Sequence, residues 1–204
     1  MNINEAAAGS GLLTTVRDEL HRRDAPLIDA DVDLIENPAL GNPRARGRLD
    51  RVEPGNLRVH RLVLGGVSFP DSPSGFNTHS DGDVVAHALV DALCGALADG
   101  SLGQYFPEDA PEDQDARSIE FLGRFLPVLN RHRAEIQNLD CTVFARDAKI
   151  APVAEEMRRN IADQLGILLS AVSLKGKNKD GFSPEGTGEA VSATVVAFVL
   201  VRDD

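Results

Sequence analysis

The chain has 204 residues, of which 42% are hydrophobic and 26% charged, enough for one sizeable core. Its formal net charge of -11 argues against a nucleic-acid-binding or anionic-membrane-binding protein, because each needs a basic patch. A small anionic ligand is still compatible, since a few local cations suffice for it. Cys94 and Cys141 are isolated, which predicts free, buried thiols in a reducing cytoplasm. We see no signal peptide and no apolar run of transmembrane length.

The first 50 residues differ in pattern from the remainder and are predicted to form an N-terminal extension. A short amphipathic helix is expected near its start, with an apolar side formed by Leu12, Leu13, Val16 and Leu20. Residues 24–50 mix acids, prolines, glycines and arginines without a sustained period, which predicts an irregular arm. Disorder and packing over a neighbouring surface both fit this composition. Residues 51–204 are expected to form the main domain.

Strands and helices follow in chain order within the main domain. Residues 57–69 favour a strand or bent hairpin around a glycine pair. Residues 80–97 predict a helix that Ser80 or Asp81 caps. A second helix is expected over residues 116–136, with Pro127 as a kink or break. The remaining predicted elements are a strand at 139–146, a helix at 151–166 ending at Gly166, a strand at 171–176 and a long strand at 189–201.

The final strand is predicted to be covered on both faces. One face carries Val191, Ala193, Val195, Ala197 and Val199, and the other carries Ser192, Thr194, Val196, Phe198 and Leu200. Both faces are largely apolar, as in strands that are buried on two sides. Helices on one side of a sheet leave the other apolar face open. An oligomer is the simplest way to close it.

The segment HSDGDVVAHALVDAL, residues 79–93, places five titratable side chains in a predicted buried helix. They are His79, Asp81, Asp83, His87 and Asp91. Such side chains are costly to bury unless something pairs with them. One interpretation is a polar network that rigidifies a subunit contact without chemistry. The other is metal ligation by His87, oriented by a carboxylate, with His60 on the preceding strand as a second ligand.

The loop KGKNKDGFSPEGTGE, residues 175–189, lies between two predicted strands and is rich in lysine and glycine. Lysine side chains and backbone N–H groups of such loops can cradle phosphates. A charged surface turn is the alternative interpretation. Lys149, just after another predicted strand, would add a cation to the same rim.

Together these segments resemble the 2-C-methyl-D-erythritol 2,4-cyclodiphosphate synthase family from about Arg51 to Val201. The strongest part of the resemblance is HSDGDVVAHALVDALCGAL, and GGVSFP, FPEDAP, ARDAKIAP and GTGEAVSATVVAFVLV follow the family's order and spacing. The first 50 residues match nothing in that family. The resemblance implies an α+β fold: a four-stranded sheet with helices packed on one face, in a homotrimer whose sheets face a central axis. The family's active sites lie at subunit interfaces.

The resemblance also implies a reaction and a set of site residues. The family performs intramolecular phosphoryl transfer on a phosphorylated cytidine nucleotide in non-mevalonate isoprenoid synthesis and releases CMP, using zinc and also magnesium or manganese. By position, His60 and His87 correspond to zinc ligands. His79 and Ser80 would bind the substrate, and Lys149 would lie near the nucleotide as a catalytic group.

One departure from the family pattern falls on the zinc site. The family's Asp-x-His becomes Arg58-Val59-His60, so a cation stands where the family has a zinc-binding carboxylate. Two histidines without a third protein ligand make an incomplete zinc site. Ser101 likewise replaces an acid in the family's Gly-Asp-Ile-Gly.

A second departure falls on the loop that binds phosphates and the other metal. The family's Thr-Thr-Thr-Glu is reduced to Lys-Asn-Lys-Asp. Depending on gap placement, its metal-binding glutamate aligns with Asp180 or Asn178. We prefer Asp180, as a catalytic residue, because KDGF then keeps acid-Gly-Phe in order. The loop also gains Lys177 and Lys179. Together with Arg58, these lysines would bind phosphates directly where the family uses metal ions.

Three functions remain open on these residues, and all three predict the same fold. The first is a working cyclodiphosphate synthase with an altered metal site. The second is a non-catalytic relative that binds a phosphorylated or nucleotide ligand, or a partner subunit in a mixed trimer. The third is an enzyme that acts on a different phosphorylated substrate.

Overall fold

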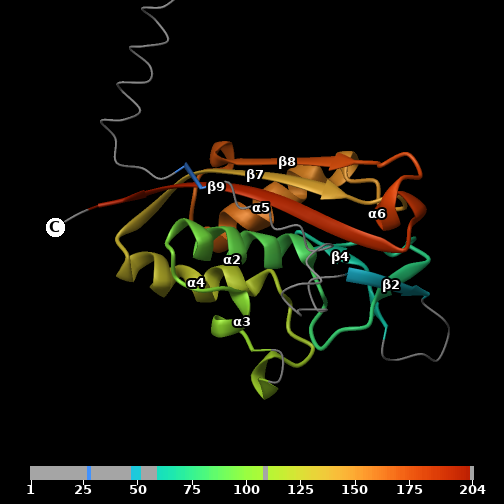
Figure 1. Ribbon diagram of the computed structural model, residues 1–204, viewed down its shortest axis with the longest axis horizontal. Coiled ribbons are helices and arrows are strands. Elements are labelled where there is room, and N and C mark those ends of the chain that lie inside the picture. Colours follow the sequence, from blue (N-terminus) through green and yellow to red (C-terminus); the bar gives the residue numbers. More distant parts are fainter. Residues whose placement is uncertain (1–26, 29–46, 52–58, 108–109, 203–204) are drawn as a thin grey trace, which may run out of the picture.

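The computed structural model describes residues 27–28, 47–51, 59–107 and 110–202 (Figure 1). The predicted amphipathic helix and most of the predicted irregular arm lie outside these residues. The strands are β1 (Leu27–Ile28), β2 (Gly47–Arg51), β3 (His60–Arg61), β4 (Val63–Leu64), β5 (Val67–Ser68), β6 (Ser74–Phe76), β7 (Ala134–Phe144), β8 (Val172–Lys177) and β9 (Ala190–Val201). The α-helices are α2 (Val84–Ala96), α3 (Leu102–Tyr105), α4 (Glu120–Arg131), α5 (Ala154–Leu165) and α6 (Ser183–Thr187), and the 3-10 turns are η2 (Pro111–Asp113), η3 (Ala151–Val153) and η4 (Leu169–Ala171).

The described strands build one large sheet and one small hairpin. The sheet has seven strands in the order β3-β6-β2-β9-β7-β8, with β1 also paired to β9, and β4 pairs only with β5. This count exceeds the expected four because several very short strands extend or flank the long ones. Two of them, β1 and most of β2, come from the predicted N-terminal extension. Residues before the predicted domain boundary therefore contribute to the sheet.

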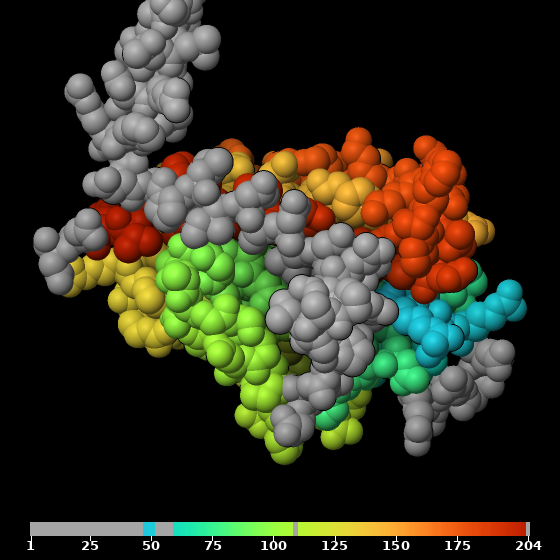
Figure 2. All heavy atoms as spheres, viewed as in Figure 1, coloured from blue at the N-terminus to red at the C-terminus, as the bar shows by residue number. Residues whose placement is uncertain are grey.

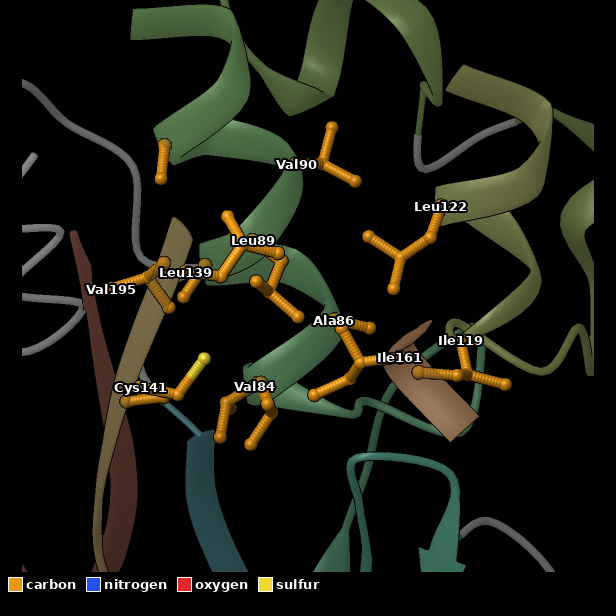
Figure 3. Close-up of a cluster of buried hydrophobic side chains, with 14 of the residues drawn as sticks. Val84, Ala86, Leu89, Val90, Ile119, Leu122, Leu139, Cys141, Ile161 and Val195 are labelled. Carbon is orange, nitrogen blue, oxygen red and sulfur yellow. The ribbon is translucent and has the colours of Figure 1, made fainter. Parts of the chain in front are cut away.

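Helices α2, α4 and α5 lie on one side of the sheet (Figure 1), which agrees with the expected α+β arrangement. Helix α2 is almost wholly apolar and buried, because it is covered on two sides. Figure 3 shows Leu89 directed toward Leu139 and Val195 of the sheet, while Leu122 of α4 lies on the other side of α2. The core therefore holds α2 rigidly between the sheet and the outer helices.

The two faces of β9 differ in burial. Val191, Ala193, Val195, Ala197 and Val199 are all buried beneath the helices. On the opposite face Thr194, Val196, Phe198 and Leu200 are only half-buried. Within the described part of this chain, the helices cover one face of β9, as predicted, and the other face is only partly covered.

Three details differ from the sequence predictions. Helix α2 begins after Asp83, whose side chain caps it, and neither Ser80 nor Asp81 is the cap. Helix α4 continues through Pro127, which lies on its exposed side, so the proline does not break the helix. Residues 134–136, expected to end that helix, instead begin β7. By contrast Gly166 ends α5 in the left-handed conformation, with a φ of 65°, as predicted. In the described ranges, no helix is long and apolar enough to cross a membrane.

Candidate functional site

Asp83 fixes the start of α2 against the β4–β5 hairpin. Its Oδ1 accepts hydrogen bonds from the N–H groups of Gly65 at 2.9 Å, Val85 at 3.0 Å and Ala86 at 3.3 Å, and its Oδ2 accepts one from Gly66 at 2.7 Å. Gly65 and Gly66 have φ values of 56° and 74°, which suit glycine and turn both N–H groups toward the carboxyl. Burial raises the pKa of Asp83 to about 7, with a contribution from Asp81, against the opposing effect of these N–H groups.

His87 lies one turn further along α2. Its Nε2 is 3.2 Å from Ser118 Oγ, and its ring stacks on Phe121 with a centroid separation of 6.0 Å. Burial lowers the pKa of His87 to about 4, although Asp81 opposes this shift. The imidazole is therefore neutral at pH 7, the form that accepts a hydrogen bond or binds a metal ion. Asp91 lies one further turn along α2. Its Oδ1 accepts a 2.6 Å hydrogen bond from Leu102 N–H, and this contact anchors the start of α3.

Ser118 connects His87 to the segment before α2. It is fully buried, and its hydroxyl lies 3.2 Å from Ser80 Oγ as well as from His87. Its backbone N–H donates to Asp81 Oδ1 at 3.1 Å, and Asp81 N–H donates to Ala116 O at 3.1 Å. Ser80, expected to bind substrate, is thus buried in this network. Sequence reasoning missed Ser118, because one serine in an apolar helical run gives no signal of burial.

His60 and His79 lie beside the same 110–118 segment. His60 Nε2 is 3.7 Å from Asp115 Oδ1, and Asp115 N–H donates to His79 O at 2.9 Å. His79 Nε2 lies 3.3 Å from the carbonyl of Ala110. Strand β6 holds β3 closely, since a Cβ on Gly75 would lie 1.8 Å from His60 O. The structure therefore gathers His60, His79 and His87 around one loop, and Asp115 is a carboxylate there that sequence reasoning did not single out.

The described donor set does not fit a zinc ion. Structural zinc sites have four protein ligands and catalytic sites usually three. Among residues 27–28, 47–51, 59–107 and 110–202, no three His, Cys, Asp or Glu side chains are grouped so that they could hold a metal ion. Arg58, which replaces the family's carboxylate, lies outside the described residues. The two imidazoles therefore remain without a complete ligand set.

The second group of predicted residues lies where β7 and β8 end. Lys177 and Asp180 are exposed, and Lys179 is half-buried. Lys179 Nζ lies 4.5 Å from the centre of the Phe144 ring and 3.8 Å from Glu185 Oε2. Asp180 adopts a φ of 48°, and its N–H donates to Asn178 Oδ1 at 3.0 Å. These contacts hold the loop in shape while Lys177 stays accessible to solvent.

Glu185 is a buried carboxylate that the sequence analysis did not identify. It is 1% exposed, and it accepts hydrogen bonds from the hydroxyls of Ser183 and, at 3.0 Å, Ser192. These hydrogen bonds, with Lys179, hold the pKa of Glu185 below its ordinary value against the opposing effect of burial. Glu185 therefore ties α6 to β9 and restrains Lys179. Figure 2 shows this α6 region beside β2, which agrees with the 2.9 Å hydrogen bond from Leu49 N–H to Glu189 O.

Lys149 follows β7 at the same end of the sheet. It is exposed and precedes Ile150, which packs on Gly176 so closely that a Cβ there would lie 2.6 Å from Ile150 Cβ. The basic group comprises Lys149, Lys177 and Lys179, and the histidine group comprises His60, His79 and His87. No hydrogen bond or ion pair within the described ranges joins the two groups directly.

Comparisons with known proteins agree with this arrangement. The YgbB family profile matches residues 51–200. The 2-C-methyl-D-erythritol 2,4-cyclodiphosphate synthase of Caldicellulosiruptor bescii is 37% identical over 139 residues, covering 68% of this chain and 88% of that protein. The same enzyme of Thioalkalivibrio sulfidiphilus is 40% identical over 138 residues, covering 68% and 86%.

Solved structures show the same likeness in three dimensions. A CDP complex of IspF from Plasmodium falciparum aligns with a TM-score of 0.63 at 26% identity, covering 76% of this chain and 91% of that one. A cyclodiphosphate synthase from Plasmodium vivax aligns with a TM-score of 0.62 at 33% identity, covering 76% and 93%. The family match spans well over half of the sequence and includes both groups of site residues. This chain belongs to the YgbB family.

Proposed function

We propose that this protein is a cyclodiphosphate synthase of non-mevalonate isoprenoid precursor synthesis that acts in the cytoplasm. Its substrate would be a phosphorylated cytidine nucleotide, and intramolecular phosphoryl transfer would release CMP. The observation that carries the proposal is the shared pattern of residues 51–200, in which relatives 37–40% identical bear this enzyme's name. The retained His60, His79 and His87 around one loop support it.

The basic group supplies the contacts that the substrate's phosphates need. Lys149 and Lys177 are exposed, and Lys179 is held by Glu185 at the same end of the sheet. Phosphoryl transfer depends mainly on positioning and charge neutralisation, which cations at a fixed loop provide. A solved structural neighbour holds CDP, which supports a cytidine nucleotide as the ligand here. Asp180 would orient the loop, as its N–H contact with Asn178 suggests.

A homotrimer would bring the two groups together. Within the described part of one chain no hydrogen bond or ion pair joins the basic group to the histidine group, and a second copy would place one group of each kind at a shared site. The half-buried face of β9, with Val196, Phe198 and Leu200, offers the apolar surface through which copies would pack. This proposal assigns the outer face of the sheet to the trimer axis.

The incomplete zinc site favours a second candidate function. In that case the protein binds a phosphorylated or nucleotide ligand without turnover, alone or as a partner subunit of another synthase. The observation behind it is that the described residues do not supply three metal ligands, while Arg58 replaces the carboxylate. Arg58 would then contact a phosphate directly. This second candidate function does not require zinc, magnesium or manganese.

CMP release separates the two candidates. The full chain is incubated with the cytidine diphosphate substrate of its relatives, with zinc and magnesium supplied, and CMP is quantified. Calorimetric titration with CDP measures binding separately. Turnover establishes the synthase, and CDP binding without CMP release establishes the second candidate. A folded protein that neither binds CDP nor releases CMP contradicts both.

A further inference from the structure

A groove lined by both apolar and polar residues lies at the end of the sheet where β7 begins, away from the basic group at the end where β7 finishes. It has a volume of about 500 Å³ and is bounded by the C-terminal ends of α4 and α5, the start of β7 and η4. Its apolar lining includes Leu126, Leu129, Ile136, Leu165, Ile167 and Leu168. Its polar lining includes Asn130, Glu135, Gln137 and Ser170. Leu168 is 76% exposed, one of two large hydrophobic residues so exposed in the described ranges. A concave surface of this kind is suited to binding apolar side chains.

Strand β1 pairs with β9 near the end of the sheet that holds this groove. It pairs antiparallel with β9, so that Leu27 lies opposite Phe198 and Ile28 opposite Ala197. Following the chain backwards from Leu27 therefore leads toward Val201, which is paired with Ala134 in the wall of the groove. Pro26, which precedes Leu27 in the sequence, has no N–H to donate to a neighbouring strand.

The preceding 26 residues contain a segment that matches the groove in chemistry. Residues 12–20 carry Leu12, Leu13, Val16 and Leu20 at helical spacing, with Arg17 and Asp18 elsewhere on the helix. A helix of nine residues is roughly 13 Å long. Residues 21–26 span up to roughly 20 Å when extended, enough to pass from the edge of the sheet to its helical side.

We propose that residues 12–20 form an amphipathic helix that docks its apolar side into this groove of the same chain. The arm would cover Leu168 and its apolar neighbours, and β1 would hold it at the correct end of the sheet. Because residues 12–20 lie outside the part that matches the family, 51–200, the docked arm would be a feature of this chain, while the groove lies within the matched part. The proposal is independent of whether the protein releases CMP.

Disulfide cross-linking in the full chain tests whether residues 12–20 occupy the groove. Val16→Cys and Leu168→Cys are combined, and the matched control combines Thr14→Cys, on the polar side of the predicted helix, with Leu168→Cys. Cys94 and Cys141 are buried and do not compete. Mild oxidation is expected to give an intrachain disulfide roughly ten-fold faster with Val16→Cys than with Thr14→Cys, because docking raises the local concentration of that thiol. Equal rates, or covalent dimers in place of intrachain links, would overturn the proposal.

Hydrogen exchange gives a second readout that leaves the core unchanged. The full chain carrying Leu13→Glu and Val16→Glu is compared with wild type and with Thr14→Glu. Docking predicts several-fold faster amide exchange in residues 126–137 and 165–171 for the double variant only, since those amides lose their cover. Identical exchange in all three proteins would contradict a docked arm.

Discussion

The carboxyl of Asp83 binds the backbone N–H of Gly66 at 2.7 Å while its other oxygen caps α2. One side chain thus joins the turn between β4 and β5 to the helix that carries His87. The two positions are 17 residues apart in sequence, and this contact holds the start of the helix that carries His87 against the β4–β5 turn. Its loss should affect stability before it affects chemistry.

Asp83→Ala is expected to lower the free energy of unfolding by about 3 kcal/mol, because it removes a helix cap and leaves buried N–H groups without a partner. Asp83→Asn keeps an amide oxygen as acceptor and should lose less. Urea denaturation followed by circular dichroism measures both. Asp71→Ala, at an exposed position, is the control; equal stability of Asp83→Ala and this control would contradict the assigned role.

His87 is expected to make stability depend on pH. Its pKa is about 4 in the folded protein against 6.5 for an ordinary histidine, so the unfolded chain binds the proton more readily. The His87 pKa shift therefore makes the free energy of unfolding depend on pH. The contribution of neutral His87 to this free energy is fully present above pH 6.5 and is lost as the pH falls toward 4. The loss should reach up to about 3 kcal/mol.

A matched variant isolates this contribution, since the raised pKa of Asp83 gives the opposite trend between pH 4 and 7. Denaturation is measured from pH 7 to pH 4 in wild type and in His87→Gln. The difference in free energy of unfolding between wild type and His87→Gln should shrink as the pH falls. The pH dependence that both proteins share, from Asp83 and other groups, cancels in this difference. A constant difference would mean that His87 titrates normally.

The sequence predicted the long elements well because their patterns are local. Helix α2 and strand β9 follow from runs of apolar residues, and Gly166 stops α5 as expected. The hairpin around Gly65 and Gly66 was also recognised. Which side chain caps α2 was not, because Ser80, Asp81 and Asp83 are all good caps and only the tertiary contact with the hairpin selects Asp83.

Contacts between distant segments were beyond sequence reasoning. Strand β2 is short and polar, and it forms because its backbone pairs with β6 on one part of its length and with β9, some 140 residues later, on the other, as in Gly47 opposite Val191. Glu185 and Ser118 look like ordinary polar residues until the fold buries them. Of the histidine group, the sequence identified each member, but the position of Asp115 depends on a loop held by His79.

The two cysteines should be unreactive in the folded protein. Cys94 and Cys141 lie in the core, and burial raises the pKa of each thiol to about 12. At pH 8 both therefore lack the thiolate that attacks disulfide reagents. Titration with a chromogenic disulfide is expected to give no labelling in buffer and two thiols per chain in denaturant. Rapid labelling in buffer would show that the core opens.

Val196→Lys is expected to dissociate the proposed trimer. Val196 lies on the half-buried face of β9, opposite Asp140 of β7, where a charge would be buried between copies. Light scattering coupled to gel filtration measures the mass. Asp163→Lys, at an exposed position on α5 on the helical side of the sheet, serves as the control and should leave the mass unchanged. A wild-type protein that is monomeric at all concentrations would contradict the proposed assembly.

Arg58→Asp should markedly raise zinc binding. It restores the family's Asp-x-His, so His60 and His87 gain the carboxylate that completes a three-ligand site. Zinc content after dialysis is measured by mass spectrometry, and wild type is expected to bind far less. Arg61→Asp makes the same charge change at an exposed position three residues away and should not increase binding. A gain confined to Arg58→Asp means that one substitution weakened the metal site. No gain in either variant means that His60 and His87 are no longer placed to share an ion.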